Sequence, residues 1–347
     1  MNEAGMYGVF CRQLSAVLKA KVSPYNALQI TGSQIENKKL KKSVELLVKD
    51  VSGGDKISDA MKQQGDRFPV IMIAAVEGAE KDGKWEEAFG NLADYFENED
   101  YLVKTSRKAT IVPAIMIFIC LFVLGVISLS IVPGFIGVFN GIDFTLPVFT
   151  QRVVLACAFI KDYLGYVFLV IAGVVLLWFL FSLSKIGRSF IDHIKMIMPL
   201  SGGVYKNLLY AQFCKYLSTL LKNGMSIYEA ARVIEDSVGY NEKVRGELHK
   251  VAEMMAAGVS LSKAIAETKV FSPMILQMTA IGEESGNLVE VLDGMSDFYT
   301  NRVGSLAHHK SIVLETVAVL LLGIIMSVVI GSMIEPMLEF YEMVGGM

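Results

Sequence analysis

The sequence predicts an all-α membrane protein: two homologous cytoplasmic helical bundles, arranged as a tandem duplication, together with three transmembrane helices. Three observations predict this architecture. Long uncharged stretches interrupt the chain three times, and the sequence at Phe10–Ala27 recurs at Phe213–Ala230. Elsewhere apolar residues recur at helical spacing, and runs with the alternation typical of β-strands are absent.

The composition places this chain of 347 residues between soluble proteins and fully embedded transporters. Hydrophobic residues make up 53% and charged residues 19%, and the mean hydropathy is +0.48. Soluble domains contain about 25% charged residues. The net charge of -3 gives no overall signature of nucleic-acid binding, so no nucleic-acid partner is expected. These values also exclude intrinsically disordered chains and disulfide scaffolds.

Three uncharged stretches are long enough to cross a membrane as helices, since a helix needs about 20 residues to cross a hydrocarbon core of ~30 Å. We place these spans at 111–134, 163–184 and 311–334. The alternative, a buried core helix of a soluble protein, is usually shorter and carries a polar stripe. The third stretch is the weakest of the three because Glu315 borders it.

Charges beside the spans predict the topology. Lys104, Arg107 and Lys108 precede the first span, whereas the tail after the third contains acidic residues and no Lys or Arg. Basic residues favour the cytoplasmic side. The predicted segments are cytoplasmic domain 1 (1–110), the first span (111–134), an outward-facing loop (135–162), the second span (163–184), cytoplasmic domain 2 (185–310), the third span (311–334) and an outward-facing tail (335–347).

The internal duplication is the most informative feature of the sequence. At an offset of 203 residues, nine of the 18 positions in Phe10–Ala27 are identical to those in Phe213–Ala230. Pro133 similarly corresponds to Pro336, so the first and third spans correspond as well. One unit, a helical domain followed by a span, therefore occurs twice. The second span is the return crossing that keeps both copies on the same side of the membrane.

Each copy has a glycine–acid–glycine segment between two predicted helices, GAEKDG at 78–83 and GEESG at 282–286. The glycines suit the left-handed conformation that ends a helix. The acid is interpreted as a cap of the next helix or as a docking group for a cation on a partner, and a simple tight turn is the other interpretation. The candidate residues are Gly78, Glu80, Gly83, Gly282, Glu284 and Gly286.

Catalytic and metal-binding patterns are missing from the sequence. Residues 78–84 imitate a phosphate-binding loop, but Trp85 stands where Ser or Thr must bind Mg²⁺. The four cysteines and four histidines show no zinc spacing or triad. We expect no enzymatic activity, cofactor or metal. Glu315, at the cytoplasmic mouth of the third span, is either a boundary residue that reaches water or a contact to a neighbouring span or a transported subunit.

The duplicated helical domain, the three spans, the openings that begin at Phe10 and Phe213, and the GEESG turn together resemble the type II secretion system protein F family over residues 5–340. Members of this family are bacterial inner-membrane platforms of type IV pilus and type II secretion machines, without enzymatic activity. The resemblance implies two six-helix bundles, a cytoplasmic N-terminus, and a loop (135–162) and C-terminal tail (335–347) in the periplasm. It also implies self-association into a dimer or higher oligomer and contact with a hexameric assembly ATPase, inner-membrane assembly proteins and prepilin or pilin subunits.

Two departures from the family pattern bear on the function. Glu315 is followed by Thr316 where members usually have Glu-Pro, although the first copy keeps Pro113. The short segment before the first domain favours a type IV pilus system. We therefore expect a platform protein that couples an assembly ATPase to pilin extraction and fibre assembly. The alternative is a type II secretion platform. A small-molecule transporter or channel subunit ranks last because the spans lack polar or broken helices.

Overall fold

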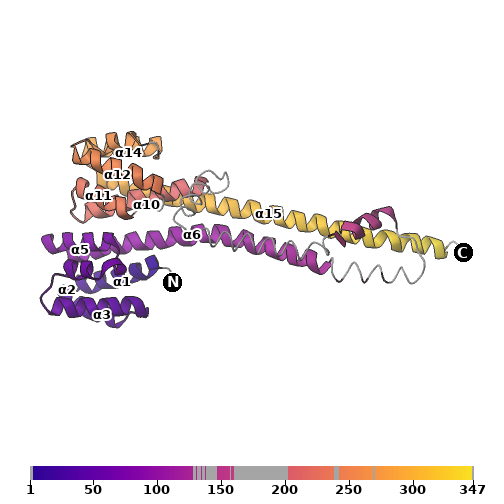
Figure 1. Ribbon diagram of the computed structural model, residues 1–347, viewed down its shortest axis with the longest axis horizontal. Coiled ribbons are helices and arrows are strands. Elements are labelled where there is room, and N and C mark those ends of the chain that lie inside the picture. Colours follow the sequence, from indigo (N-terminus) through magenta and orange to yellow (C-terminus); the bar gives the residue numbers. More distant parts are fainter. Residues whose placement is uncertain are drawn as a thin grey trace. The chain divides into compact units, whose positions relative to one another are not determined.

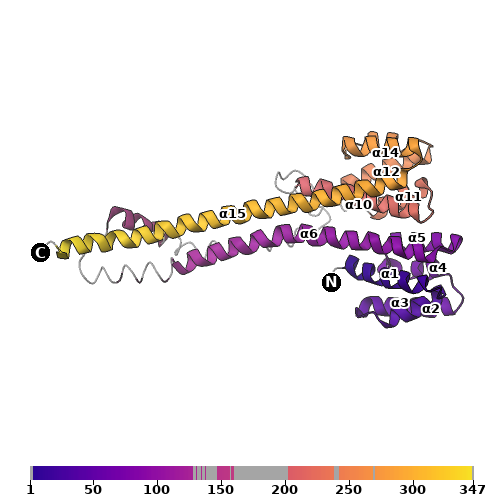
Figure 2. The same cartoon turned by 180° about the vertical axis from the view of Figure 1, so that it is seen from behind.

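The computed structural model describes residues 3–127, 130, 134, 137, 147–156, 158–159, 202–237, 242–268 and 270–345. All regular elements in these ranges are helices, which confirms the all-α class (Figures 1 and 2). The chain divides into two compact units. Unit 1 contains residues 1–106 and 192–306, and unit 2 contains residues 107–191 and 307–347. Both copies of the duplicated domain therefore belong to unit 1.

The described residues of each copy contribute six α-helices in the same order, as the duplication predicts. Copy 1 contains α1 (Glu3–Lys19), α2 (Pro24–Ser33), α3 (Lys38–Ser52), α4 (Ile57–Gln63), α5 (Val70–Asp82) and α6 (Trp85–Val126). Copy 2 contains α10 (Gly202–Lys222), α11 (Ile227–Ser237), α12 (Glu242–Ala256), α13 (Leu261–Ala266), α14 (Pro273–Ser285) and α15 (Leu288–Gly345).

Two helices, α2 and α14, begin with a Ser-Pro pair. The Ser23 hydroxyl accepts a hydrogen bond from the backbone N–H of Asn26, and the Ser272 hydroxyl accepts one from Ile275, at 3.5 and 3.4 Å. Each satisfies one of the unpaired N–H groups of a first helical turn. Proline follows at the first helical position of α2 and α14. Proline fits there because its missing N–H needs no partner.

The turn after the first helix of each copy uses the left-handed conformation. Gly224 has φ of 81°, and Lys21 at the equivalent position of copy 1 has φ of 64°. Lys21 is the one non-glycine residue with positive φ in the described part of the chain. A side chain in this conformation is strained because its Cβ crowds the following carbonyl oxygen.

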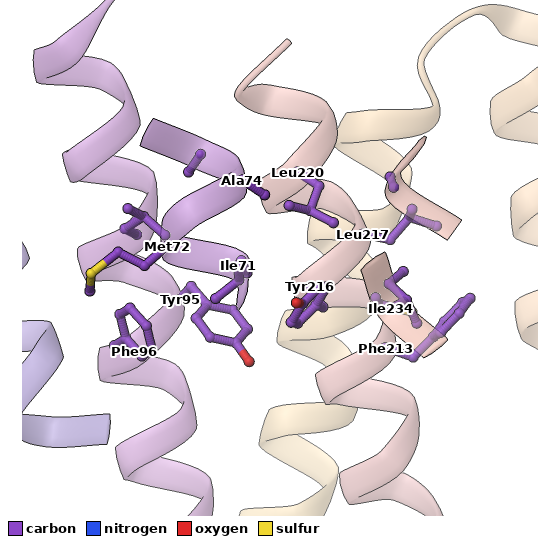
Figure 3. Packing of buried hydrophobic residues seen from close by; sticks show 14 of the residues in the cluster. Ile71, Met72, Ala74, Tyr95, Phe96, Phe213, Tyr216, Leu217, Leu220 and Ile234 are labelled. Carbon is purple, nitrogen blue, oxygen red and sulfur yellow. The ribbon is translucent and has the colours of Figure 1, made fainter. Parts of the chain in front are cut away.

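Several of the residues that are identical in the two copies are core residues. Phe10 and Phe213 are both buried, and so are the thiols of Cys11 and Cys214. Burial raises the pKa of both thiols, that of Cys214 to about 12, so they are packing groups without reactive thiolate character. A single cluster of buried side chains draws on both copies (Figure 3).

Unit 2 holds the apolar parts of the chain. Among the described residues one helix, α15, is long and apolar enough to cross a membrane, over Leu288–Glu342. The α6 helix continues to Val126, and its residues in the first predicted span include exposed apolar side chains such as Phe118 and Phe122. The second predicted span, 163–184, lies outside the described residues. The three-span topology and the domain boundaries therefore stay predictions.

Within unit 2, α15 packs against two other segments. Ile127 and Val329 form a small buried cluster. The hydroxyl of Thr150, from a short helical segment at 148–156, donates to the backbone oxygen of Ser332 at 2.9 Å. This bond satisfies a buried hydroxyl on an apolar helix face, where an unpaired polar group costs free energy.

Candidate functional site

The acid of the glycine–acid–glycine segment caps a helix in copy 1. Glu80, in the last turn of α5, accepts a hydrogen bond from the backbone N–H of Ser58 at 3.0 Å and another from the Ser58 hydroxyl. Ser58 lies in the first turn of α4. The N-cap residue of α4, Lys56, makes no capping bond with its own side chain. Glu80, which lies 22 residues further along the chain, therefore supplies the acceptor that the start of α4 lacks.

Copy 2 repeats this arrangement with Glu283. Its carboxylate accepts from the backbone N–H groups of Leu261 and Ser262, at 2.6 and 3.2 Å, and from the Ser262 hydroxyl. These residues form the first turn of α13, whose N-cap Ser260 also makes no side-chain cap. The same carboxylate-to-helix link has been kept in both copies. The acid caps the preceding helix along the chain, not the next helix as the sequence analysis interprets it.

The sequence analysis treats Glu284 as the residue of copy 2 that is equivalent to Glu80, and this assignment is wrong by one residue. The α5 and α14 helices are both 13 residues long, and each ends at a left-handed glycine, Gly83 or Gly286, with φ of 71° and 73°. Counting back three residues from these glycines gives Glu80 and Glu283. Glu284 therefore occupies the position of Lys81, and its side chain is exposed. The ungapped 203-residue offset would have found this register.

Gly78 and Gly282 are helical residues inside α5 and α14, not turn residues as the sequence predicts, and they serve different contacts. A Cβ atom on Gly78 would lie 2.4 Å from the backbone oxygen of Asn223 in copy 2. A Cβ on Gly282 would lie 3.0 Å from the Cα of Leu288, at the start of the next helix of its own copy. Gly78 thus allows close approach between copies, and Gly282 allows close approach within one.

Gly78 belongs to a larger contact that we call the inter-copy seam: α5 and α6 of copy 1 against α10, α11 and the first part of α15. The side-chain amide of Asn91 donates to the Asn223 side-chain oxygen at 3.0 Å. The rings of Tyr95 and Tyr216 meet edge to face, with centroids 5.5 Å apart (Figure 3). The Asn98 side chain bonds to the hydroxyl of Thr300 at 3.3 Å, one further step along α6.

The sequence analysis missed this seam. Asn91, Tyr95 and Asn98 recur at helical spacing on α6 and give that helix a second, polar stripe beside its apolar one. That polar stripe was the one feature in this segment that indicated a second contact surface on α6. Its partners lie 132 residues away for Asn91 and 202 for Asn98, and the hydrophobic periodicity of a single helix cannot identify them.

Two carboxyl groups of unit 1, Glu99 in copy 1 and Asp293 in copy 2, have shifted pKa values. Burial raises the pKa of Glu99 on α6, and a hydrogen bond from Tyr95 opposes this only in part. In copy 2, burial alone would raise the pKa of Asp293, but hydrogen bonds from Lys215 and Lys222, both at 2.8 Å, hold it below its ordinary value. The carboxylate of Asp293 thus ties α15 to α10 at two positions that lie about two helical turns apart.

A cavity of about 240 Å³ lies in unit 1 where α5 meets α11 and the end of α10. Its apolar lining includes Val70, Ile73, Met225 and Val233, and its charged lining includes Lys62, Glu77, Lys81 and Glu229. The described residues contain no cluster of three or more His, Cys, Asp or Glu side chains that could hold a metal ion.

Glu315 is half-buried on α15, and its carboxylate accepts a hydrogen bond from the Ser311 hydroxyl at 2.9 Å. Ser311 lies one turn earlier on the same helix, so this bond links no second element. This hydrogen bond offsets part of the free-energy cost of placing a carboxylate beside an apolar stretch. Both interpretations of Glu315, a boundary residue or a contact to another subunit, stay predictions.

These features define a class of protein: a tandem pair of six-helix copies joined by a buried seam, with one helix in the described part of the chain, α15, long and apolar enough to cross a membrane. The chain belongs to the type II secretion system protein F family. The family model matches residues 10–133 and 213–336, once in each copy.

The similarity to several named proteins covers almost the whole chain. This chain is 28% identical to the type IV pilus assembly protein PilC of Pseudomonas aeruginosa, over 97% of this chain and 90% of that protein. It is also 28% identical to the PilC protein of Myxococcus xanthus, over 97% and 80% of the two chains. A type II secretion system protein F from Aeromonas hydrophila is 26% identical over 96% of this chain and 86% of its own length.

Proposed function

We propose that this protein is the inner-membrane platform protein of a type IV pilus assembly machine. It couples a cytoplasmic assembly ATPase to the extraction of pilin subunits from the bilayer and to fibre assembly. The observation that carries this proposal is the family match in both copies, together with relatives named as type IV pilus assembly proteins over 97% of the chain.

The architecture supports a mechanical role. The α6 and α15 helices, 42 and 58 residues long, each run without an intervening loop from a helical bundle into an apolar segment. The seam holds the two copies together through buried rings and paired amides. A displacement of one copy therefore moves the other and also moves both long helices. In the proposed topology the N-terminus is cytoplasmic and the C-terminus periplasmic.

The proposed partners are those of an assembly platform: a hexameric ATPase, inner-membrane assembly proteins, prepilin or pilin subunits and further copies of this chain. The protein itself needs no catalytic residue, since ATP hydrolysis takes place on the ATPase. Glu315 is proposed as an interaction residue where α15 enters the apolar segment, facing a neighbouring span or a pilin subunit.

Deletion of the gene, followed by complementation with the full chain, tests this function. Surface fibres are counted by electron microscopy, and secreted proteins are measured in the same cultures. Loss of fibres with normal secretion is the expected result, and the intact chain should restore the fibres. Normal fibres in the deletion strain would contradict the proposal.

A type II secretion platform is the second candidate, because a relative named type II secretion system protein F is 26% identical over 96% of this chain. The same cultures distinguish the two candidates. Intact fibres combined with lost secretion would favour the secretion platform over the pilus platform.

A further inference from the structure

The inter-copy seam is a contact between two different surfaces, one from each copy. The first is the outer face of α5 in copy 1, and the second is the elbow formed by the end of α10 and by α11 in copy 2. Gly78 on α5 meets Asn223 at this elbow, and Val233 of α11 lines the same cavity as Ile73 of α5. Because the chain is duplicated, a second example of each surface exists elsewhere in the molecule.

The second example of the α5 surface lies on α14 of copy 2. At the offset of 203 residues, Ile281 stands at the position of Gly78, and its side chain is 53% exposed. Met278 beside it is 36% exposed. Glu284, also exposed, stands at the position of Lys81. We call Met278, Ile281 and Glu284 the α14 face.

The second example of the elbow lies at α1 and α2 of copy 1. Ile30 stands at the position of Val233 and is 43% exposed. Lys21 stands at the position of Gly224 and is exposed, as is Lys19 just before it. We call Lys19, Lys21 and Ile30 the α2 face. Figures 1 and 2 both show α5, α10 and α11 between α14 and α2, with α3 beside α2 at the outer edge of copy 1.

Charge on the two exposed faces is complementary. At the internal contact, Lys81 of α5 and Glu229 of α11 line one cavity with opposite charges. On the exposed faces Glu284 stands in place of Lys81, whereas the α2 face carries Lys21 in place of Gly224 and has Asn26 in place of Glu229, so the α14 face is acidic and the α2 face is basic. Such an arrangement favours α14 against α2 and disfavours either face against itself.

We propose that the α14 face of one molecule binds the α2 face of a second copy of this chain. The contact repeats between molecules the one that α5 makes with the α10–α11 elbow inside the chain. Since Ile281 replaces Gly78, the backbones cannot approach as closely as they do at Asn223. The exposed side chains of Met278 and Ile281 meet Ile30 instead. The two faces differ, so the contact is head-to-tail, and each added molecule presents another unused face.

Cysteine crosslinking between two differently tagged full-length chains tests this contact. Ile30→Cys is placed in one chain and Ile281→Cys in the other, with Cys120 and Cys157 replaced by Ala and the buried Cys11 and Cys214 retained. Mild oxidation of membranes that contain both chains should give a mixed dimer in a yield several-fold above the controls. Either variant expressed alone should give almost none. The control pair is Lys49→Cys with Glu253→Cys, two exposed positions outside both faces.

A mixed-dimer yield no higher than that of the control pair would overturn the proposal. Efficient crosslinking of Ile281→Cys with itself would overturn it too, because that result requires a two-fold symmetric contact. Charge exchange is a second measurement. Glu284→Lys and Lys21→Glu should each lower the yield, and the two together in every chain should restore it. Failure of restoration would contradict the charge pairing. The proposal is independent of the proposed function, since fibre counts do not enter these outcomes.

Discussion

At the residue scale, two glutamates each join two helices of their own copy through one carboxylate. Glu80 links α5 to the start of α4, and Glu283 links α14 to the start of α13. Both α4 and α13 are short and lack a capping bond from their own N-cap side chain. The remote carboxylate satisfies their first N–H groups and complements the positive end of the helix dipole.

Removal of this cap should lower stability. Glu283→Ala should cost about 1–2 kcal/mol of unfolding free energy, because two backbone N–H groups and a hydroxyl lose their acceptor. The neighbouring Glu284→Ala makes the same change of residue type on the exposed side of α14, and it should shift stability by less than about 0.5 kcal/mol. Chemical denaturation of the purified protein in detergent, followed by circular dichroism, measures both. Equal losses from the two variants would contradict the assigned register.

Lys21 offers the opposite change, a stabilising substitution. It holds a left-handed conformation with φ of 64°, which copy 2 gives to a glycine. Lys21→Gly should therefore raise stability by roughly 1 kcal/mol, because glycine adopts this conformation without strain. Lys42→Gly, on the exposed side of α3, should lower it by a similar amount. The two melting temperatures should thus move in opposite directions, and a fall in both would contradict this explanation.

At the scale of the element, α6 makes different contacts on two of its faces. One face packs Phe89, Leu92 and Phe96 into the core of copy 1. Another presents Asn91, Tyr95 and Asn98 to copy 2. Glu99 lies beside this second face, where burial raises its pKa. Its ionised form is therefore less favourable in the folded protein than in the unfolded chain.

The pH dependence of Glu99 follows from that shift. A carboxyl whose folded pKa is raised costs stability when the pH lies above the folded pKa, and the cost disappears below the unfolded value of about 4.3. Glu99→Gln should therefore raise stability at pH 7, and this gain should vanish as the pH falls below about 4. Denaturation midpoints of both proteins across this range give the test. A gain that stays constant with pH would contradict the prediction.

Sequence patterns predicted the helices of each copy because their causes are local. Left-handed glycines and apolar periodicity act within a few residues, and the repeat of Phe10–Ala27 at Phe213–Ala230 predicted that the two copies share one fold. The capping role of Glu283 was missed because the six-residue segment 78–83 was matched with the five-residue segment 282–286. That match paired Glu80 with Glu284 instead of Glu283. The seam was missed for a different reason: a contact such as Asn98–Thr300 depends on how two copies pack, and the residues of one copy alone do not encode it.

At the scale of the whole molecule, the two copies act as one body because the seam is buried and specific. Gly78 is its tightest point, since any Cβ there would meet the backbone oxygen of Asn223. Backbone cannot move aside as the end of a flexible side chain does, so a larger residue must push the copies apart.

Gly78→Ala should destabilise the protein by about 1–3 kcal/mol, the cost of overpacking a filled contact. Gly294→Ala is the matched control, since it is also helical and its Cβ would meet no atom within 4 Å. That control should be neutral or stabilising by up to about 1 kcal/mol. Limited proteolysis of the folded protein should cleave the Gly78 variant faster. Equal stability of the two variants would contradict the tight seam.

The central claim is that both copies lie on the cytoplasmic side and form one scaffold. Labelling with a membrane-impermeant maleimide in intact spheroplasts tests it most directly. One cysteine at a time is introduced, at Lys49 in copy 1, Glu253 in copy 2 or Glu339 in the tail, with Cys120 and Cys157 replaced by Ala and the buried Cys11 and Cys214 retained. The account predicts that Glu339→Cys reacts at once, whereas Lys49→Cys and Glu253→Cys react only after lysis. Reaction of one copy from outside while the other stays protected would contradict it.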